Sequence, residues 1–298
     1  MKILLLGKNG QVGWELQRSL STLGQVLALS SQSQDYCGDF NDLKGVAGSV
    51  QRFAPDVIVN AAAYTAVDKA ESEPDQALRV NAEAPAVLAA EARKLNALLV
   101  HYSTDYVFAG DGEAPWQESD QVGPLSVYGA TKLQGERAIE ASGCAYLILR
   151  TSWVYAARGN NFAKTMLRLA TERESLNVID DQFGAPTGAD LLADVTAHAI
   201  RATRINPQLE GNYHLAAAGE TTWHRYARFV LEQAQAADVQ LKVAPASLGA
   251  ITTASYPTPA RRPGNSRLNT QKLQNAFSLR LPEWQDGVAR MLTEILEK

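Results

Sequence analysis

Short apolar runs and longer amphipathic segments alternate along the first half of the chain. The apolar runs are rich in Ile, Leu and Val and span residues 3–6, 26–29, 57–59, 98–100 and 146–149. Continuous apolar runs of this length are typical of strands buried on both faces of a parallel sheet. Segments with helical spacing of apolar residues lie between them and span residues 12–23, 43–53, 85–95 and 127–141. This alternation predicts an α/β fold with a doubly wound parallel sheet.

The second half of the chain has a different pattern. Helical spacing of apolar residues covers residues 162–171, 189–203, 223–236 and 284–296. Turn-rich stretches lie between these segments, and the one at 255–265 holds several prolines. Because proline interrupts helices and central strands, we expect an ordered surface loop there that closes over a site. We therefore predict a Rossmann-like sheet domain over residues 1–150 and a smaller, mostly helical domain over residues 151–298, with room for the chain to return to the first domain.

Composition and charge narrow the classes of partner. Hydrophobic residues make up 46% of the chain and charged residues 20%, which is ordinary for a globular protein. The net charge is −4 and no run of Lys or Arg stands out, which argues against a nucleic-acid partner. No apolar stretch is long enough to span a membrane, and the run before Gly7 is too short for a signal peptide. Cys37 and Cys144 lie far apart in sequence, so we expect reduced thiols in a cytoplasmic protein.

Three glycines follow the first predicted strand and open the first predicted helix. Gly7, Gly10 and Gly13 have the spacing GxxGxxG. Such a turn needs glycine because the chain turns tightly, the backbone approaches a pyrophosphate, and the helix packs close to the strand. The N–H groups of the helix N-terminus then favour an anionic diphosphate. The sequence predicts that the first domain binds a dinucleotide, which leaves the substrate to the second domain.

The end of the second strand bears on the choice of dinucleotide. It carries Ser30 and Ser31, with neither the acid that binds a ribose 2′-hydroxyl nor an arginine for a 2′-phosphate. Small hydroxyl side chains tolerate both, so we expect NADPH or NADH to bind, with Ser30 beside the ribose. Asp39 and Phe40 are expected to hold the adenine ring. The alternative for Asp39 is to cap the helix that follows.

Two hydroxyl groups and a lysine are the catalytic candidates. Tyr128 and Lys132 lie on one face of a predicted helix, one turn apart. A nearby ammonium favours the phenolate and brings a tyrosine of pKa about 10 towards the working range. The alternative is an exposed helical pair. Thr104 lies at the end of a predicted strand, where ligands of open α/β sheets bind, and can donate a hydrogen bond to a carbonyl oxygen. Ser103 is its rival for this role.

These features together resemble the extended short-chain dehydrogenase/reductases and, within them, the dTDP-4-dehydrorhamnose reductase family. The segments that carry the resemblance span residues 60–71, 103–110, 127–136, 149–155, 180–187 and 261–268, along nearly the whole chain. The first three segments indicate only the broad superfamily, and the last three carry the substrate class. The resemblance implies NAD(P)H-dependent reduction of the 4-keto group of dTDP-4-dehydro-L-rhamnose to dTDP-L-rhamnose.

The resemblance also implies roles for individual residues. Tyr128 would protonate the C4 oxygen, Lys132 would hold the nicotinamide ribose, and Thr104 would bond the same oxygen. The further residues implied at the cofactor are Gly10, Gln11 and Val12 at the diphosphate, Ala62, Ala63 and Thr65 along its border, and Tyr102 near the nicotinamide ribose. Asp105 and Trp153 would contact the nucleotide-sugar substrate.

Physical arguments add to the substrate site. Trp153 presents an aromatic face that stacks on a sugar or base, although a core tryptophan is the alternative. Asn161 opens a predicted helix whose N-terminus suits a substrate diphosphate. Arg262 is a candidate clamp on that diphosphate, unless it and Arg261 are ordinary solvated charges. Gln182 is expected near the sugar or the loop beside it.

Metal, assembly and competing functions complete the expectations. Glu294 and Glu297 lie one helical turn apart and are candidates for a magnesium site. Some members of the resembled family use magnesium at a subunit contact. The alternative for the two glutamates is a solvated helix face. We expect a homodimer from base rates alone. The rival functions are a reductase or epimerase of another nucleotide sugar, and a non-catalytic regulatory subunit of the methionine adenosyltransferase type. Thr104, Tyr128 and Lys132 argue against the second.

Overall fold

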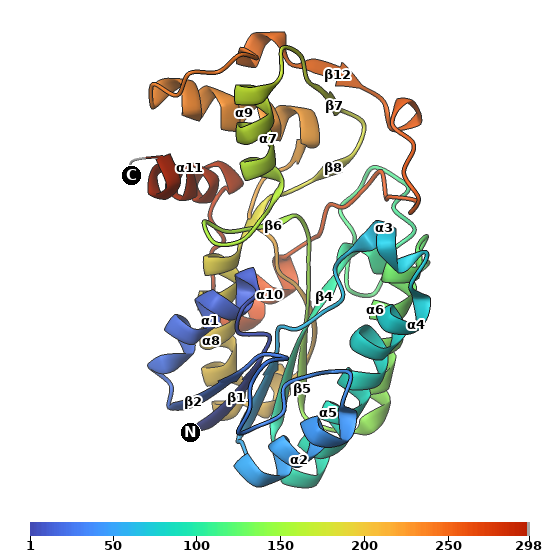
Figure 1. Cartoon of the computed structure of the whole chain (residues 1–298). Helices are drawn as coiled ribbons and strands as arrows, with labels where there is room; N and C mark the ends of the chain where they lie inside the picture. The colour runs from blue at the N-terminus through green and yellow to red at the C-terminus, as the bar shows by residue number, and fades with distance from the viewer. Residues whose placement is uncertain (297–298) are drawn as a thin grey trace.

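A six-stranded parallel sheet forms the larger part of the computed structural model, which describes residues 1–296 (Figure 1). Its strand order is β10-β5-β4-β3-β1-β2, and every neighbouring pair is parallel. The strands are β1 (Lys2–Leu6), β2 (Gln25–Leu29), β3 (Val57–Asn60), β4 (Leu98–Thr104), β5 (Tyr146–Thr151) and β10 (Gly211–His214). The predicted doubly wound α/β sheet is confirmed.

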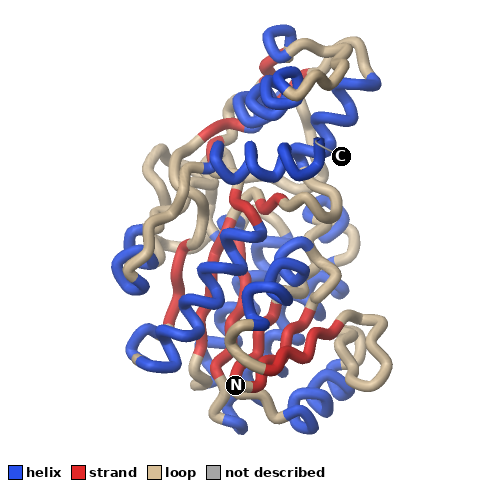
Figure 2. Tube along the Cα trace, turned by 90° about the vertical axis from the view of Figure 1, so that its left-hand side faces the viewer, coloured by secondary structure: helices blue, strands red, loops and turns tan. Residues whose placement is uncertain are grey.

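Helices cover both faces of this sheet, as Figure 1 and Figure 2 show. One face carries α1 (Gln11–Ser21), α8 (Ala189–Ile205) and α10 (Gln271–Phe277), and the other carries α2 (Leu43–Phe53), α5 (Ala84–Leu95) and α6 (Val127–Ser142). Side chains of β1 alternate between the two cores: Ile3 and Leu5 face α1 and α8, whereas Leu4 and Leu6 face α2 and α5. The short helices α3 (Val67–Ala70) and α4 (Pro74–Leu78) and a π-helical turn (Arg79–Glu83) lead into α5.

Two strands differ from the sequence prediction. The run 26–29 was expected to be buried on both faces, but β2 is an edge strand that pairs with β1 alone. Its residues Val26, Leu27 and Ala28 are therefore only half-buried. β10 was not predicted, and it lies beside β5 at the other edge. The expected domain boundary after residue 150 falls inside β5, and β10, α8 and α10 all come from the second half of the chain.

A smaller layer of helices and short strands lies beyond the carboxyl ends of the large sheet (Figure 1, top). It contains β6 (Val154–Tyr155), α7 (Phe162–Glu172), β7 (Asn177–Ile179), β8 (Phe183–Gly184), β9 (Thr187–Gly188), β11 (Thr221–Thr222), α9 (Trp223–Ala236), β12 (Gly249–Ile251) and α11 (Trp284–Leu296). Aromatic side chains of α7, α9 and α11 form its core, with Tyr226 packed edge-on against Trp284. The short strands pair as β12 with β7, β6 with β9, and β11 with β8.

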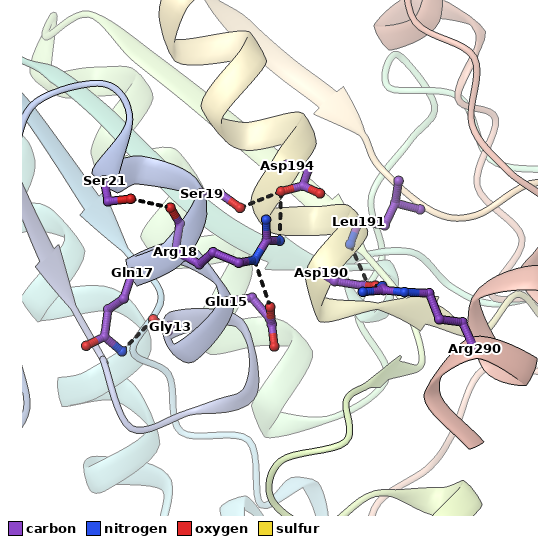
Figure 3. A network of polar contacts seen from close by, with 10 residues as sticks. All are labelled: Gly13, Glu15, Gln17, Arg18, Ser19, Ser21, Asp190, Leu191, Asp194 and Arg290. Carbon is purple, nitrogen blue, oxygen red and sulfur yellow. Dashed lines mark hydrogen bonds and ion pairs between the residues drawn. The ribbon is translucent and has the colours of Figure 1, made fainter. Parts of the chain in front are cut away.

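Polar contacts of α8 reach α1 in the same layer and α11 in the smaller layer (Figure 3). Arg18 of α1 pairs with Asp194 at 2.9 Å, and Arg290 of α11 pairs with Asp190. Because the two arginines are mostly exposed, each pair contributes only about 0–1 kcal/mol. Packing against α1, more than these charges, therefore holds α8 in the larger layer. Within residues 1–296, none of the helices combines the length and the apolar character that a membrane crossing requires.

Candidate active site

At Gly7 and Gly13, the turn between β1 and α1 approaches neighbouring backbone too closely for any side chain. A Cβ on Gly13 would lie 2.0 Å from the carbonyl oxygen of Gly7. Gly7 has φ +88°, and a Cβ there would lie 2.6 Å from the backbone nitrogen of Ala62. Gly10 occupies the N-cap position of α1 and offers no capping side chain. The N-terminus of α1 therefore presents free N–H groups and a backbone cradle that fits the diphosphate of a dinucleotide.

The other predicted cofactor residues follow β1, β2 and β3 at the same edge of the sheet. Gln11 and Val12 lie half-buried in the first turn of α1, Ala62 and Ala63 lie half-buried after β3, and Thr65 is exposed. Ser30 is buried at the end of β2. The structure thus brings the glycine turn, the end of β2 and the segment after β3 together where ligands of open α/β sheets bind.

The segment expected to hold adenine lies between β2 and α2. Phe40 is buried in the core beneath α2. The carboxylate of Asp39 accepts hydrogen bonds from the backbone and side-chain amides of Asn41, at 3.0 and 3.1 Å. Asp42 instead caps α2 by accepting from the backbone N–H of Gly45 at 2.9 Å. The alternative interpretation of Asp39 as the helix cap is therefore wrong.

Tyr128 and Thr104 meet at the carboxyl end of β4. Ser126 caps α6 by accepting from the N–H of Gly129, and Gly129 packs directly on the carbonyl of Tyr106 after β4. The Thr104 hydroxyl donates to Asp105 at 3.0 Å and also lowers the pKa of Tyr128 through a hydrogen bond. The two predicted hydroxyl groups thus lie side by side.

Burial dominates the proton affinity of Tyr128. It raises the pKa of the phenol to about 12, against the opposing effect of Thr104. The charge of Asp105 raises it further. Nζ of Lys132 donates to the carbonyl of Tyr102 at 2.5 Å and lies 3.1 Å from Nε2 of His101. The expectation that Lys132 lowers the Tyr128 pKa stays a prediction.

Lys132 and its neighbours are deeply buried. Burial lowers the pKa of Lys132 to about 8, and the charge of Glu136 acts in the opposite direction. Tyr102 is buried with its hydroxyl 2.5 Å from the hydroxyl of Thr196 on α8. Burial also raises the pKa of Asp105 to about 6. Ser103, the rival of Thr104, is buried and its hydroxyl finds no hydrogen-bond partner within residues 1–296.

Trp153 is held in a strained backbone conformation in front of another tryptophan. Its φ is +49°, which is rare for a bulky side chain and marks stored strain. Its ring stacks on Trp223 with centroids 3.6 Å apart and planes 16° from parallel. Gly184 lies against the same ring, since a Cβ there would be 2.7 Å from Cε2 of Trp153. Trp153 is half-buried, so it is not a fully enclosed core tryptophan.

Gln182 connects this stacked pair to a loop. Its Oε1 accepts from the indole N–H of Trp223, and its Nε2 donates to the hydroxyl of Thr253, both at 3.1 Å. The carboxylate of Asp181 in turn accepts from the backbone N–H and the hydroxyl of Thr253. Gln182 is 4% exposed, so both of its bonds are shielded from water. Its amide therefore fixes the plane of Trp223.

Arg262 borders a cavity of about 800 Å³ in the smaller layer. The cavity is also lined by Phe162, Gln182 and Trp223. One guanidinium nitrogen of Arg262 donates to Asp68 of α3 at 2.7 Å. Its Nε is buried and lacks a hydrogen-bond partner among the described residues. Arg262 thus has donor capacity left at the wall of the cavity.

Asn161 caps α7 and lies beside the glycine turn. Its Oδ1 accepts from the backbone N–H of Lys164 at 3.1 Å. Its Nδ2 donates to Oε1 of Gln11 at 3.2 Å and to the carbonyl of Ala156 at 2.7 Å. One of the free N–H groups expected at this helix N-terminus is therefore occupied by Asn161 itself, and the residue links α7 to the predicted cofactor site.

The magnesium candidates lie near the end of α11. Glu294 is exposed and borders a hollow of about 220 Å³ together with Glu15 and Asp190, while Glu297 lies outside the described residues. Asp190 is already paired with Arg290. In the described part of the chain, residues 1–296, no group of three His, Cys, Asp or Glu side chains is arranged to hold a metal ion.

Three residues at the site were not singled out from the sequence. Trp223 stacks on Trp153, and Asn60 and His101 contact the lysine network. The signal for His101 was present, because it is a polar residue that continues an apolar run. Trp223 had no such signal, since a tryptophan at the start of an amphipathic helix is also typical of a core.

Comparison with known proteins identifies the family. The family model described as the RmlD substrate binding domain matches residues 1–297. The dTDP-4-dehydrorhamnose reductase of Shigella flexneri is 60% identical over 295 residues, which cover 99% of this chain and 98% of that protein. The solved structure of the dTDP-4-dehydrorhamnose reductase of Clostridium acetobutylicum superposes on 100% of this chain and 100% of its own, with 35% identity and a TM-score of 0.89. The structure of the Bacillus anthracis dTDP-4-dehydrorhamnose reductase in complex with NADP covers 98% of this chain and 99% of its own, with 32% identity and a TM-score of 0.86. The chain belongs to the dTDP-4-dehydrorhamnose reductase family.

Proposed function

We propose that this protein reduces the 4-keto group of dTDP-4-dehydro-L-rhamnose to give dTDP-L-rhamnose, with NADPH or NADH as the hydride donor. Full-length identity of 60% to a dTDP-4-dehydrorhamnose reductase supports the substrate. The observation that carries the chemistry is the adjacent pair of hydroxyls, buried Thr104 and half-buried Tyr128, at the carboxyl end of the strands, where the glycine turn also lies. The description of the B. anthracis relative as an NADP complex supports a nicotinamide cofactor.

Each residue at the sheet edge has a role in this proposal. When bound, the cofactor supplies the hydride that the carbonyl carbon accepts. Tyr128 gives the proton that the carbonyl oxygen needs, so that C=O, hydride and proton become CH–OH. Because its pKa is raised to about 12, the phenol holds this proton at neutral pH. Thr104 donates its one hydroxyl proton to the same oxygen in place of Asp105, and Lys132 holds the nicotinamide ribose.

The cofactor is proposed to extend from Lys132 along the carboxyl ends of the strands. Its diphosphate lies at the glycine turn, with Gly7, Gly10, Gln11, Val12 and Gly13. Ala62, Ala63, Thr65 and Tyr102 border it, and Ser30, Asp39 and Phe40 hold its adenosine end. The use of both NADPH and NADH is proposed because the end of β2 carries only small hydroxyls.

The smaller layer is proposed to bind the nucleotide sugar. Asp105 and Trp153 contact the sugar, with Gln182 and Trp223 fixing the tryptophan from behind. Arg262 is proposed to bind the diphosphate, which its buried and unpartnered Nε supports. Asn161 is assigned to the junction of substrate and cofactor, because it contacts Gln11. The homodimer, the cytoplasmic location and a magnesium site at Glu294 stay predictions from the sequence.

Replacement of Tyr128 by phenylalanine tests this proposal. We expect NADPH oxidation with dTDP-4-dehydro-L-rhamnose to fall by a factor of about 10² or more, because the proton donor is lost. NADPH binding, followed by fluorescence titration, should change little. The matched control is Tyr146→Phe, which removes a hydroxyl from the first residue of β5, at the amino ends of the strands and away from the site. Unchanged turnover in Tyr128→Phe, or no turnover by folded wild-type protein that binds NADPH, would contradict the assignment.

A further inference from the structure

A string of buried polar groups crosses from β3 through β4 to α6. Asn60, His101 and Lys132 are 1%, 1% and 2% exposed. Asn60 and His101 are partners in the β3–β4 register, and their side chains meet with Nδ2 of Asn60 3.0 Å from Nδ1 of His101. Nε2 of His101 lies 3.1 Å from Nζ of Lys132, which donates in turn to the carbonyl of Tyr102 at 2.5 Å.

The backbone fixes the direction of the first bond in this string. The N–H of Ala62 can only donate, and it lies 3.1 Å from Oδ1 of Asn60. The other end of the Asn60 amide is therefore its NH₂ group, which can also only donate. It points at Nδ1 of His101, so this ring nitrogen accepts and carries no proton.

The rest of the string follows from this tautomer. A neutral imidazole with a bare Nδ1 carries its proton on Nε2, and that N–H faces Nζ of Lys132. A second proton on His101 would set two donors against each other at Asn60. Burial and the charge of Lys132 also hold the pKa of His101 well below its ordinary value. An ammonium has three donors and no acceptor, so only the neutral amine of Lys132 has a lone pair for the Nε2 proton.

We propose that His101, oriented by Asn60, is a positioning residue that stabilises the neutral amine of Lys132 by donating its Nε2–H to the amine lone pair. Lys132 then gains and loses its proton near neutral pH rather than remaining a permanent cation beside Tyr128. The consequence for catalysis rests on the reduction proposed above, whereas the tautomer and the protonation of Lys132 do not.

The charged groups around Lys132 act in both directions. Burial lowers the pKa of Lys132 to about 8. A hydrogen-bond donor to the neutral amine lowers the pKa in the same direction. Glu136, one turn further along α6, raises it. The carboxylate of Glu136 is already paired with Arg150 of β5, and Tyr128 lies one turn before Lys132 on α6. His101 is therefore the titratable side chain on β4 that faces the amine directly, beside the carbonyl of Tyr102.

Asn60→Asp reverses the direction of the hydrogen bonds along the string without changing the shape of the side chain at position 60. One carboxylate oxygen still accepts from Ala62, while the other now accepts from His101. The proton of the imidazole moves to Nδ1, and Nε2 becomes an acceptor that favours the ammonium of Lys132. The Lys132 pKa should therefore rise. Asn275→Asp on the exposed face of α10 is the matched control, since it adds the same charge away from the string.

The readout is nuclear magnetic resonance of the full-length protein without substrate. The ¹⁵N shifts of His101 report which ring nitrogen holds the proton, and the ¹³Cε shift of Lys132 followed against pH reports its pKa. Signals are assigned by their loss in His101→Gln and Lys132→Met. We expect the Nε2–H tautomer and a Lys132 pKa at least about one unit below that of a free lysine in the wild type and in Asn275→Asp.

Three results would overturn the proposal. They are an Nδ1–H tautomer in the wild type, an ordinary lysine pKa there, or a Lys132 pKa in Asn60→Asp that equals the wild-type value. The pH profile of kcat/KM supplies the catalytic readout, because its limb for Lys132 should move to higher pH in Asn60→Asp but not in Asn275→Asp. If the tautomer is as expected but no NADPH is oxidised, the proposed function fails while the assignment of His101 stands.

Discussion

The replacement Glu136→Gln tests how a buried ion pair supports the catalytic helix. Glu136 of α6 and Arg150 of β5 form two parallel hydrogen bonds, at 2.9 and 2.7 Å. Their side chains are 1% and 4% exposed. Bidentate pairs of this kind are strong, and this one lies one helical turn from Lys132. We expect the substitution to affect both the free energy of unfolding and the Lys132 pKa.

The size of the effect follows from the geometry. At 2.7 Å and an effective dielectric constant of about 20, the charges attract by about 6 kcal/mol, most of which offsets their desolvation. The glutamine removes this attraction but leaves Arg150 charged and buried. One glutamine NH₂ would also face an arginine N–H, and Nη1 of Arg150 already lacks a partner among the described residues. Breaking one side of such a pair costs about 3–5 kcal/mol.

Urea denaturation of the wild type, Glu136→Gln and the double variant Glu136→Gln/Arg150→Met measures this cost. The double variant removes both charges, so it should recover more than half of the lost stability. Glu232→Gln is the control, because its pairing with Arg228 is exposed and it should change stability by less than about 0.5 kcal/mol. The Lys132 pKa should also fall below about 8 in Glu136→Gln. A loss under about 1 kcal/mol, or a double variant no more stable than the single one, would refute the reasoning.

Three further predictions address the cofactor turn, the tryptophan pair and pH. Gly13→Ala places a methyl 2.0 Å from a carbonyl oxygen of the turn and should weaken NADPH binding at least about tenfold in a fluorescence titration. The control Gly48→Ala, whose methyl meets nothing within 4 Å, should leave the affinity unchanged. Equal affinities of the two variants would contradict this prediction. Gln182→Leu leaves the indole N–H of Trp223, behind Trp153, without its hydrogen bond. It should raise KM for the nucleotide sugar about tenfold with a smaller change in kcat. A fall in kcat alone would count against this role of Gln182. Burial and, to a smaller extent, the charge of Arg150 lower the pKa of His214 from 6.5 to about 3. Between these two pH values the unfolded chain binds more protons than the folded one, so the free energy of unfolding falls as the pH falls. The loss should reach about 2–3 kcal/mol by about pH 4.5 in urea denaturation and be smaller in His214→Gln, and identical pH dependence in the two proteins would rule out this cause.

Much of the fold was predictable because its signal is local. The helices at 43–53 and 223–236 have the predicted bounds, since their apolar residues recur at helical spacing and Asp42 and Thr222 cap them. β4 extends four residues beyond the predicted run because His101, Ser103 and Thr104 are polar yet buried. β10 escaped prediction because Gly211–His214 carries little apolar pattern and lies at a sheet edge.

The parts of the site that the sequence did not predict depend on long-range contacts. Trp153 was a substrate candidate, but its partner Trp223 is distant in sequence, and no periodicity connects the two rings. Lys132 was expected to act on Tyr128. Its Nζ also contacts β4, because α6 packs against that strand and brings the amine to His101 and the carbonyl of Tyr102. Spacing along a helix indicates which residues share a face, and it says nothing about the strand that the face meets.

Transfer of deuterium from the cofactor tests the central proposal most directly. The wild-type protein would be incubated with dTDP-4-dehydro-L-rhamnose and NADPH that carries two deuterium atoms at C4 of its nicotinamide. The product would be analysed by mass spectrometry and nuclear magnetic resonance. The proposal predicts dTDP-L-rhamnose with one deuterium on C4 of the sugar. A product without deuterium at that carbon, a product of the opposite configuration at C4, or unchanged substrate beside a folded protein that binds NADPH would contradict it.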